Sequence, residues 1–576
     1  MTKKYFLAIL CLLSIHHVLL PLYSQTRTVG LFMNDTAQAS KGYTLLSPMQ
    51  STSTYLINNE GRVVHKWSNS KYTPGRSVFL LPNGHLLRTG SVRNDSIFTG
   101  GGDGGRIEEF TWGDTLVWNF NYTSTTYTAH HDIRRLPNGN ILVLACEKKL
   151  LSEMMSAGFD TSRFQSDLRT RKYIMPEYLI EVQPTYPSGG NIIWQWHVWD
   201  HLIQDLNPAK QNYGVVRNHP ELVCTLGSLD SVGGGGSQPI FWNHANAIDY
   251  NSKFDQIMIS CRNSSEIWVI DHATTTAEAA GHTGGKYGKG GDLLYRWGNP
   301  KCYRMGTSAN QKLFQQHNVS WIDSTSVGGG DMLCFNNGVG RKYTSADQFT
   351  PPVDSRGFYT REAGKAFGPS NLTWTYAATP PTSFYCTDLG GASRLANGNT
   401  LLCNGIFGQL FEVTAGGQTV WKYVNPIVPS GPLNWSAVIP SDPNAQGQLW
   451  NEVFRAQRYA PSYQGLAGRN LTPGNLLEIN LTGIEETERN PLSSLQIYPN
   501  PFQTASTIHF ELQDDGPVKL VLYDFFGREL AVLLNERKTA GIYTVNCDAA
   551  GLPGGIYLCT LTAGGSSASK KLMILR

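Results

Sequence analysis

The chain has few charged residues and no concentration of basic ones. Aspartate, glutamate, lysine and arginine make up 16% of its 576 residues, and the formal net charge is +3. Nucleic-acid binding needs a dense basic face, so this charge balance gives no support for a nucleic-acid partner. Lys3 and Lys4 precede an apolar stretch over 5–22, and a cleavage point at Ser24 predicts a signal peptide over residues 1–24. The apolar stretch is short and contains two histidines, so we expect no transmembrane anchor in the mature chain.

The cysteines are too scattered for a disulfide framework or a thiolate metal site. Nine of the ten lie beyond the signal peptide, which is an odd number, and no two are separated by two residues. We expect Cys146, Cys261, Cys334 and Cys403 to be buried thiols in strands. The sequence also lacks the Gly-x-Ser-x-Gly motif of serine hydrolases, so a serine nucleophile has no support.

Glycine and aromatic residues are abundant, and one strand-rich unit recurs along most of the chain. The unit opens on an Asn-Gly turn between apolar runs, as in LPNGHLL (81–87), LPNGNIL (136–142) and LANGNTLL (395–402). It ends on a tryptophan that we expect to pack in the core. Opening and ending together make about four strands, the size of a propeller blade. The endings fall at Trp67, Trp118, Trp196, Trp297 and Trp421.

We therefore predict an all-β fold whose main domain, residues 25–481, is a six-bladed β-propeller. Long insertions at 150–172, 200–238 and 273–291 interrupt the blades, the first of them helical, and such insertions often build or cover a binding site. The predicted blades are 43–67, 77–120, 131–197, 244–297, 317–376 and 390–424.

A charged linker over 482–491 separates the propeller from a small unit, residues 492–576. Short alternating strands in this unit predict an Ig-like β-sandwich. The expected strands are 495–498, 506–512, 518–523, 541–546, 555–562 and 569–575.

Three histidines occupy the same position of three successive repeats. They open the segments HDIRRLPN at His131, HANAIDYN at His244 and HNVSWIDS at His317. Equivalent positions of a closed propeller converge on its centre, so the three imidazoles should face one cavity. The same position in the second repeat is occupied by Arg76, which should therefore face the same cavity as a further cation. Because neighbouring strand residues alternate in direction, His130 should point away or cap the group from the side.

The small unit resembles the type A sorting domain of the type IX secretion system of Bacteroidota. The resemblance implies handling by the type IX secretion machinery, passage through the periplasm and a secreted or cell-surface location. Its motifs are IYPNPF (497–502), LYDFFGR (522–528), AGIY (540–543), LPGGIY (552–557) and KKLMIL (570–575).

Residues 43–466 resemble the bacterial arylsulfate sulfotransferase family. Members transfer a sulfuryl group from an aryl sulfate donor to a phenolic acceptor through a sulfated histidine, without a nucleotide sulfate donor or another cofactor. The resemblance implies that His317 is the nucleophile, and that His131, His244 and Arg262 hold sulfate oxygens and assist proton movement. The shared motifs include HHDIRRLPNGN (130–140), WQWHVWDH (194–201), HANAIDY (244–250), ISCR (259–262), QQH (315–317) and FNNGVGR (335–341).

These residue types suit sulfuryl transfer. A neutral imidazole is a competent nucleophile near neutral pH, and Arg262 offers a planar fork of donors to sulfuryl oxygens. Asn337 stands before Gly338 either as part of a hairpin turn or as a contact to the acceptor. With Arg76 and His130 it completes the candidate substrate-binding residues.

The sequence also allows other functions. Three histidines could bind zinc or copper, but no carboxylate shares their register, and His197 and His201 lack the glutamate of an H-E-x-x-H site, so no metal is expected. The alternatives to an enzyme of this family are a catalytically silent propeller used for ligand binding or surface interaction, and another propeller enzyme such as a quinone-dependent dehydrogenase or a lyase.

Overall fold

The structure is a computed structural model that divides into two compact units, Met1–Leu481 and Thr482–Arg576. The predicted signal peptide and linker lie outside the described residues. No helix within the described ranges is long and apolar enough to cross a membrane. The described residues are 27–92, 101–161, 172–225, 242–443, 447–479, 495–512, 514–524, 528–563 and 566–575.

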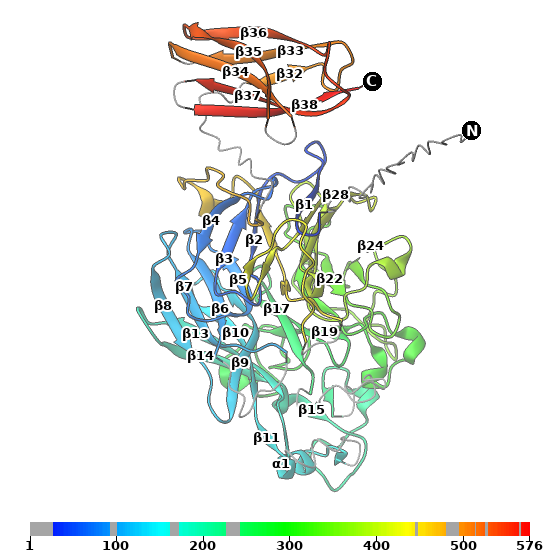
Figure 1. The fold of residues 1–576 in the computed structure, drawn as a ribbon. Helices are drawn as coiled ribbons and strands as arrows, with labels where there is room; N and C mark the ends of the chain where they lie inside the picture. The colour runs from blue at the N-terminus through cyan, green and yellow to red at the C-terminus, as the bar shows by residue number, and fades with distance from the viewer. Residues whose placement is uncertain are drawn as a thin grey trace, which may run out of the picture. The chain divides into compact units, whose positions relative to one another are not determined.

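Six antiparallel sheets of one plan follow one another through the described part of the first unit (Figure 1). In each sheet the strands lie in chain order, and the first strands of neighbouring sheets contact each other. The first three sheets contain β2 (Tyr43–Leu46), β3 (Thr54–Ile57) and β4 (Val63–Trp67); β5 (Pro74–Leu80), β6 (Leu86–Ser91), β7 (Gly105–Phe110) and β8 (Leu116–Asn121); and β9 (Tyr127–Arg135), β10 (Ile141–Glu147), β13 (Glu177–Pro184) and β14 (Gly190–His197). The other three contain β17 (Ala245–Asn251), β18 (Gln256–Cys261), β19 (Glu266–Asp271) and β20 (Tyr295–Trp297); β21 (His317–Trp321), β22 (Met332–Asn336), β23 (Ser345–Phe349) and β24 (Trp374–Ala377); and β25 (Gly391–Arg394), β26 (Thr400–Asn404), β27 (Gln409–Val413) and β28 (Thr419–Val424).

Strands from the two ends of the unit complete the first and last sheets. β31 (Gln457–Tyr459) pairs with β2, and β1 (Gly30–Asn34) pairs with β28. The first sheet thus receives a strand from the far end of the unit. Such pairing covers edges that would otherwise expose unpaired backbone groups.

Six tryptophans link each sheet to the next. The indole Nε1 of Trp67 donates to the Thr111 carbonyl at 3.0 Å, and the indole of Trp421, in the sixth sheet, donates to the Asn59 carbonyl of the first sheet at 2.8 Å. The order of these bonds is that of a ring, because the last one returns to the first sheet. Four of the bonds lie between these two, from Trp118 to Gly189, Trp196 to Gly291, Trp297 to Pro369 and Trp374 to Ala415.

The five predicted repeat tryptophans are buried, as expected of core residues. Trp374, which the repeat pattern does not single out, supplies the bond from the fifth sheet to the sixth. The four cysteines expected in strands are buried as well.

Short elements fill the insertions between the strands. The predicted helix in the first insertion is present in the described part as α1, which places Met154 in the apolar core. The other short elements are β11 (Lys149–Leu150), β12 (Tyr173–Ile174), η2 (Val198–His201), β15 (Leu202–Ile203), η3 (Val216–Asn218), β16 (Val223–Cys224), α3 (Thr276–Ala279), η4 (Pro300–Tyr303), η5 (Ser308–Asn310), η6 (Pro381–Ser383), η7 (Gly405–Phe407), β29 (Ile427–Val428), β30 (Gly431–Pro432) and η8 (Gln464–Leu466), and α1 spans Leu151–Ser156.

The second unit is a pair of antiparallel sheets around one apolar core that includes Phe510, Leu520 and Leu561. One strand, β35, is absent from the sequence prediction, because ELAVLLNERK mixes charges and apolar residues without a clean alternation. The Ig-like topology stays a prediction. The sheets contain β32 (Gln496–Tyr498), β33 (Ala505–Leu512) and β36 (Gly541–Asp548), and β35 (Glu529–Lys538), β34 (Gly516–Tyr523), β37 (Gly555–Ala563) and β38 (Ser566–Ile574).

Candidate functional site

The three predicted histidines lie at or next to irregular stretches of the first strands of their sheets: His131 is inside β9, His244 directly precedes β17, and His317 begins β21. His131 has φ +50° inside an irregular stretch of the β9–β10 ladder, and His244 has φ +49° just before β17. His317 begins β21, and the ladder shifts directly after it at Asn318. A bulge turns a side chain away from the direction that strand alternation would give it. This local irregularity aims the imidazoles.

His244 and His317 do not occupy equivalent positions, so the common register predicted for the histidines is wrong by one residue. The last pair before the bulge of β21 is His317 with Phe335, whereas the last pair before the bulge of β17 is Ala245 with Cys261. His244 precedes this pair. Counting from the turns could not detect the offset, since a bulge adds a residue without changing the apolar pattern.

His131 and His244 nevertheless lie together, with ring centroids 5.1 Å apart. Of the two placements expected for His130, the geometry matches the one at the side of the group: its Nδ1 is 2.8 Å from Nδ1 of His131. Gly102 closes the other side of His131. Its backbone has φ +108°, and a Cβ there would lie 1.9 Å from the imidazole Cε1. Only glycine fits this approach.

Burial keeps these histidines neutral. It lowers the pKa of His130 to about 3, and it lowers the pKa of His131 far below the usual range, helped by the neighbouring histidines and Arg76. The pKa of His244 falls in the same direction, through burial and then Arg262. Neutral imidazoles here act as hydrogen-bond donors and acceptors, not as fixed cations.

The hydrogen bonds of His317 define its tautomer. Nδ2 of Asn337 donates to the carbonyls of Cys386 and Leu389, both at 2.9 Å, so Oδ1 of Asn337 is left as an acceptor. Nδ1 of His317 lies 2.9 Å from that oxygen and must carry a proton. In the neutral ring the lone pair is therefore on Nε2. The buried Asn337 holds the imidazole instead of forming a simple turn.

Nε2 of His317 faces a residue that the sequence analysis did not select. Oδ1 of Asp388 lies 3.1 Å from Nε2 and 3.7 Å from Nε of Arg262. Burial alone raises the pKa of Asp388, but Arg262 and then His317 lower it overall, so the carboxylate is charged. Asp388 lies in the loop between β24 and β25, and the loop brings it into the site. No sequence pattern marks this residue.

Two arginine side chains of the site have unused donors. Within the described residues, the buried Nε atoms of Arg76 and Arg262 have no hydrogen-bond partner. Burial lowers the pKa of Arg76, against the attraction of Asp103, Glu452 and Asp388. Buried guanidinium donors without a hydrogen bond are costly unless an anion uses them, and the ion pair of Arg262 with Asp388, at 3.7 Å, is longer than a hydrogen bond.

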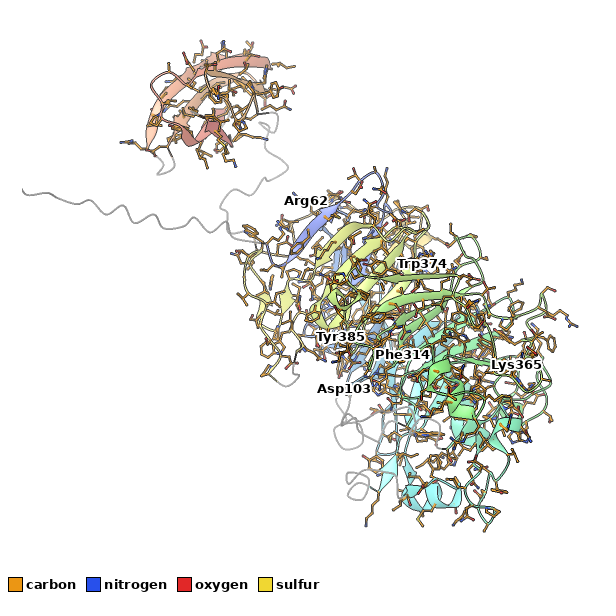
Figure 2. All side chains as sticks on the ribbon, turned by 90° about the vertical axis from the view of Figure 1, so that its right-hand side faces the viewer. Arg62, Asp103, Phe314, Lys365, Trp374 and Tyr385 are labelled. Atoms are coloured by element: carbon orange, nitrogen blue, oxygen red, sulfur yellow. The ribbon has the colours of Figure 1, made fainter. Side chains whose placement is uncertain are left out.

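Phe454 is a second residue that the sequence analysis missed. Its ring lies 6.0 Å from the ring of His131 and 6.3 Å from that of His317. It comes from the segment that returns after the sixth sheet, and its carbonyl accepts from the Gly390 amide at 2.9 Å. Figure 2 labels Asp103, Phe314 and Tyr385, from loops before β7, β21 and β25, in one region of its view. The loops before β7 and β25 reach the histidines, through Gly102 beside His131 and Asp388 beside His317.

The fold and this centre define an all-β protein with a buried histidine–arginine site suited to an anion. A family model described as arylsulfotransferase (ASST) matches residues 28–425, and the chain belongs to that family. A second family model, the secretion system C-terminal sorting domain, matches residues 496–575. The sorting domain implies type IX secretion and a secreted or surface location. No curated protein matches the chain.

Solved structures give only distant likenesses. A protein of unknown function from Bacteroides caccae is 13% identical, with a TM-score of 0.37 over 73% of this chain and 99% of its own. Kuenenia stuttgartiensis hydrazine synthase is 12% identical, with a TM-score of 0.30 over 54% of this chain and 68% of its own. A catalytically inactive virginiamycin B lyase from Staphylococcus aureus is 9% identical, with a TM-score of 0.29 over 68% of this chain and 88% of its own. These likenesses are too weak to bear on function.

Proposed function

We propose that this protein moves a sulfuryl group from an aryl sulfate to a phenol through a sulfohistidine at Nε2 of His317, without a nucleotide sulfate donor. The observation that carries the proposal is the tautomer lock. Asn337 fixes the proton on Nδ1, so the nucleophilic lone pair of the neutral ring belongs to Nε2, the atom that lies beside Asp388, which also pairs with Arg262. A nucleophile held by a neighbouring side chain is the pattern of covalent catalysis.

In the first half-reaction Nε2 attacks the sulfur of the donor. The N–S bond forms as the bond between sulfur and the aryl oxygen breaks, and both electrons of that bond leave with the phenolate. In the second half-reaction the oxygen of the acceptor attacks the same sulfur and the N–S bond breaks. One proton passes overall from the acceptor phenol to the donor phenolate, and nothing is oxidised or reduced. Two half-reactions on one histidine predict ping-pong kinetics.

Arg262 and Arg76 supply the positive charge for the sulfuryl oxygens. Their unused Nε donors are fixed before the substrate arrives, which is the condition for electrostatic stabilisation of a transition state. His131 and His244 add hydrogen bonds from neutral rings and can relay the proton between phenols. An anionic ligand raises the pKa of a nearby histidine, so these rings become better proton carriers when substrate is bound.

Asp388 has to move during this cycle. Oδ1 of Asp388 can only accept, so its contact with Nε2 at 3.1 Å needs a proton on that nitrogen. Attack requires that this proton and the carboxylate leave, which frees the Nε2 lone pair for the sulfur. The Asp388 side chain is 38% exposed, so it can turn toward solvent without leaving a buried charge unpaired. We propose that Asp388 competes with the substrate for this site: its carboxylate pairs with Arg262 and His317 until a sulfate ester displaces it.

The same contact favours the second candidate, a catalytically silent propeller that binds an anion. If Asp388 never leaves Nε2, the site binds but does not turn over. The ring order of the six tryptophan bonds supports a six-bladed propeller for either function, and the paired sheets of the second unit are consistent with an Ig-like sandwich. For both candidates the partner in export is the type IX machinery.

A burst experiment separates the two candidates. Purified protein is mixed with excess 4-nitrophenyl sulfate and no acceptor, and released nitrophenol is followed together with the intact mass of the protein. If the protein is a sulfotransferase, each active site releases one nitrophenol and the protein gains the mass of one sulfuryl group. Both effects should be absent in His317→Ala and retained in His219→Ala, which changes a partly exposed histidine. If no burst is seen and no turnover follows when phenol is added, the protein is an anion-binding propeller without catalytic activity. A burst in His317→Ala would exclude His317 as the nucleophile.

A further inference from the structure

A second group of histidines lies in the insertions of the third and fourth sheets. His201 ends η2, and His282 and Asp292 lie in the loop between β19 and β20. Nδ1 of His201 and Nδ1 of His282 each lie 2.8 Å from the same atom, Oδ1 of Asp292. Among the described residues these three offer ligand atoms that all lie within 4.8 Å of one another.

The proton on His201 is fixed by a carbonyl. Nε2 of His201 lies 2.8 Å from the oxygen of Ala279, which can only accept, so Nε2 carries the proton. The lone pair of the neutral ring is then on Nδ1 and points at a carboxylate oxygen. Two acceptors face each other unless a positive charge lies between them. A backbone carbonyl that orients a histidine in this way is the usual outer partner of a metal ligand.

The ring of His201 has no freedom to avoid this contact. It is fully buried and stacks on Trp196, with centroids 5.7 Å apart and an interplanar angle of 7°. A Cβ at Gly291 would lie 2.6 Å from Nε2 of His201, so only glycine fits there. The indole of Trp196 donates to the Gly291 carbonyl at 2.7 Å, which holds the loop against the ring.

We propose that His201, His282 and Asp292 bind one Zn²⁺ ion, which ties the loop between β19 and β20 to the third sheet. Two imidazole nitrogens and one carboxylate oxygen are ligands that zinc takes, at about 2.0–2.2 Å in a tetrahedral site. The side chain of His282 is 58% exposed, so a water molecule can complete the coordination from solvent. This site shares no residue with the histidine–arginine centre.

His197, the other histidine of the WQWHVWDH motif, is not part of this group. It ends β14 and pairs through Nδ1 with Oε1 of Glu147 at 2.9 Å. The four-residue spacing of His197 and His201 therefore does not make a ligand pair. The partners of His201 come from a loop about eighty residues further along the chain, and no local pattern of the kind used for zinc motifs indicates them.

The test is zinc titration of the chelator-treated full-length mature protein by calorimetry, with the visible spectrum of bound Co²⁺ as a second readout. We expect one equivalent of Zn²⁺ and the intense bands of tetrahedral Co²⁺. His282→Ala and Asp292→Asn should each weaken Zn²⁺ binding by about tenfold or more. His282 is exposed, so its variant should fold, and circular dichroism checks both variants.

His219→Ala is the matched control, because among the described residues His219 pairs with Glu221 at 2.9 Å but belongs to no group of three possible metal ligands. It should bind Zn²⁺ as the wild type does. The proposal is overturned if the wild type takes up no Zn²⁺, if it prefers Ca²⁺, or if His282→Ala binds Zn²⁺ as tightly as the wild type. Without any metal uptake the three residues are ion pairs of His201 and His282 with Asp292 and nothing more.

Discussion

Asn337 Oδ1 accepts the Nδ1 proton of His317 at 2.9 Å, and this one bond decides which imidazole nitrogen can react. Asn337 is itself held by two backbone carbonyls, so its amide cannot flip without losing both bonds. Orienting the imidazole adds no free energy to the activation barrier, because folding has already set its orientation. It makes Asn337 a positioning residue that acts through His317.

Replacing Asn337 by leucine should lower kcat about 10²-fold and change KM much less. The imidazole would lose its orientation and the preference for the Nδ1–H tautomer, whereas the groups that hold the sulfate stay. Steady-state kinetics with an aryl sulfate and a phenol measures the split between kcat and KM. Thermal unfolding of the variant shows whether lost activity is lost fold. An unchanged kcat in a folded variant would remove Asn337 from the mechanism.

Arg262→Lys should lower kcat/KM for aryl sulfates about 10²-fold. Lysine keeps the charge but loses the planar donors that reach two sulfuryl oxygens at once. Arg356→Lys is the control, because the Arg356 side chain is 76% exposed and its ion pair is with Asp354. Initial rates at several donor concentrations give the comparison. Equal loss in both variants would mean that Arg262 is a structural cation only.

Ligand binding should take up protons. The pKa values of His131 and His244 lie well below the ordinary range in the free protein, and an anion beside them raises both. Between the free and the bound pKa the complex holds more protons than the free protein, so affinity must fall as pH rises through that window. An aryl sulfonate, which has no leaving group, is the probe.

Calorimetry of this probe in two buffers with different ionisation enthalpies counts the protons taken up. His131→Asn should reduce the uptake, and His85→Asn, outside the site, should leave it unchanged. Affinity that is independent of pH with no proton uptake would show that the imidazoles do not respond to the anion.

The sequence predicts the sheets better than the site. Asn-Gly turns and repeat tryptophans are local signals, and the strands around them lie close to where they are expected. Bulges are not local, because an extra residue is defined only by its partner strand. For that reason His244 and His317 seemed equivalent, although their pairing differs by one residue. Asp388 and Phe454 reach the site through loops and a returning segment, where no periodic pattern exists to be read.

An ion triad around His272 predicts how stability depends on pH. His272 lies 2.6 Å from Oδ1 of Asp255 and 3.0 Å from Oε2 of Glu181, which joins the third and fourth sheets. Burial alone lowers the pKa of His272, but the bonds to Asp255 and Glu181 raise it to about 9. A raised pKa means that the folded state binds the proton more tightly than the unfolded chain. The stabilisation is therefore complete below about pH 6.5 and is lost as pH rises through about 9.

His272→Gln should reduce the free energy of unfolding by about 2 kcal/mol near pH 7 and by far less above about pH 10. Urea unfolding at both pH values measures the difference. His282→Gln, which removes an imidazole that is 58% exposed, should show only a small change when zinc is removed. A His272 variant with the same deficit at both pH values would assign the effect to lost packing.

Asp388→Asn tests whether the carboxylate competes with the substrate. The amide keeps the shape of the side chain but removes the negative charge that faces Arg262 and His317, so a sulfonate should bind several-fold more tightly. Asp354→Asn, which changes an acid paired with Arg356 by the same one charge, should leave the affinity as it is. If Asp388 only competes, the variant also keeps its nitrophenol burst and its KM for the donor falls. If instead the affinity of Asp388→Asn is lower than that of the wild type, the carboxylate helps to hold the ligand, and its contact with Nε2 belongs to the bound state as well as to the free one.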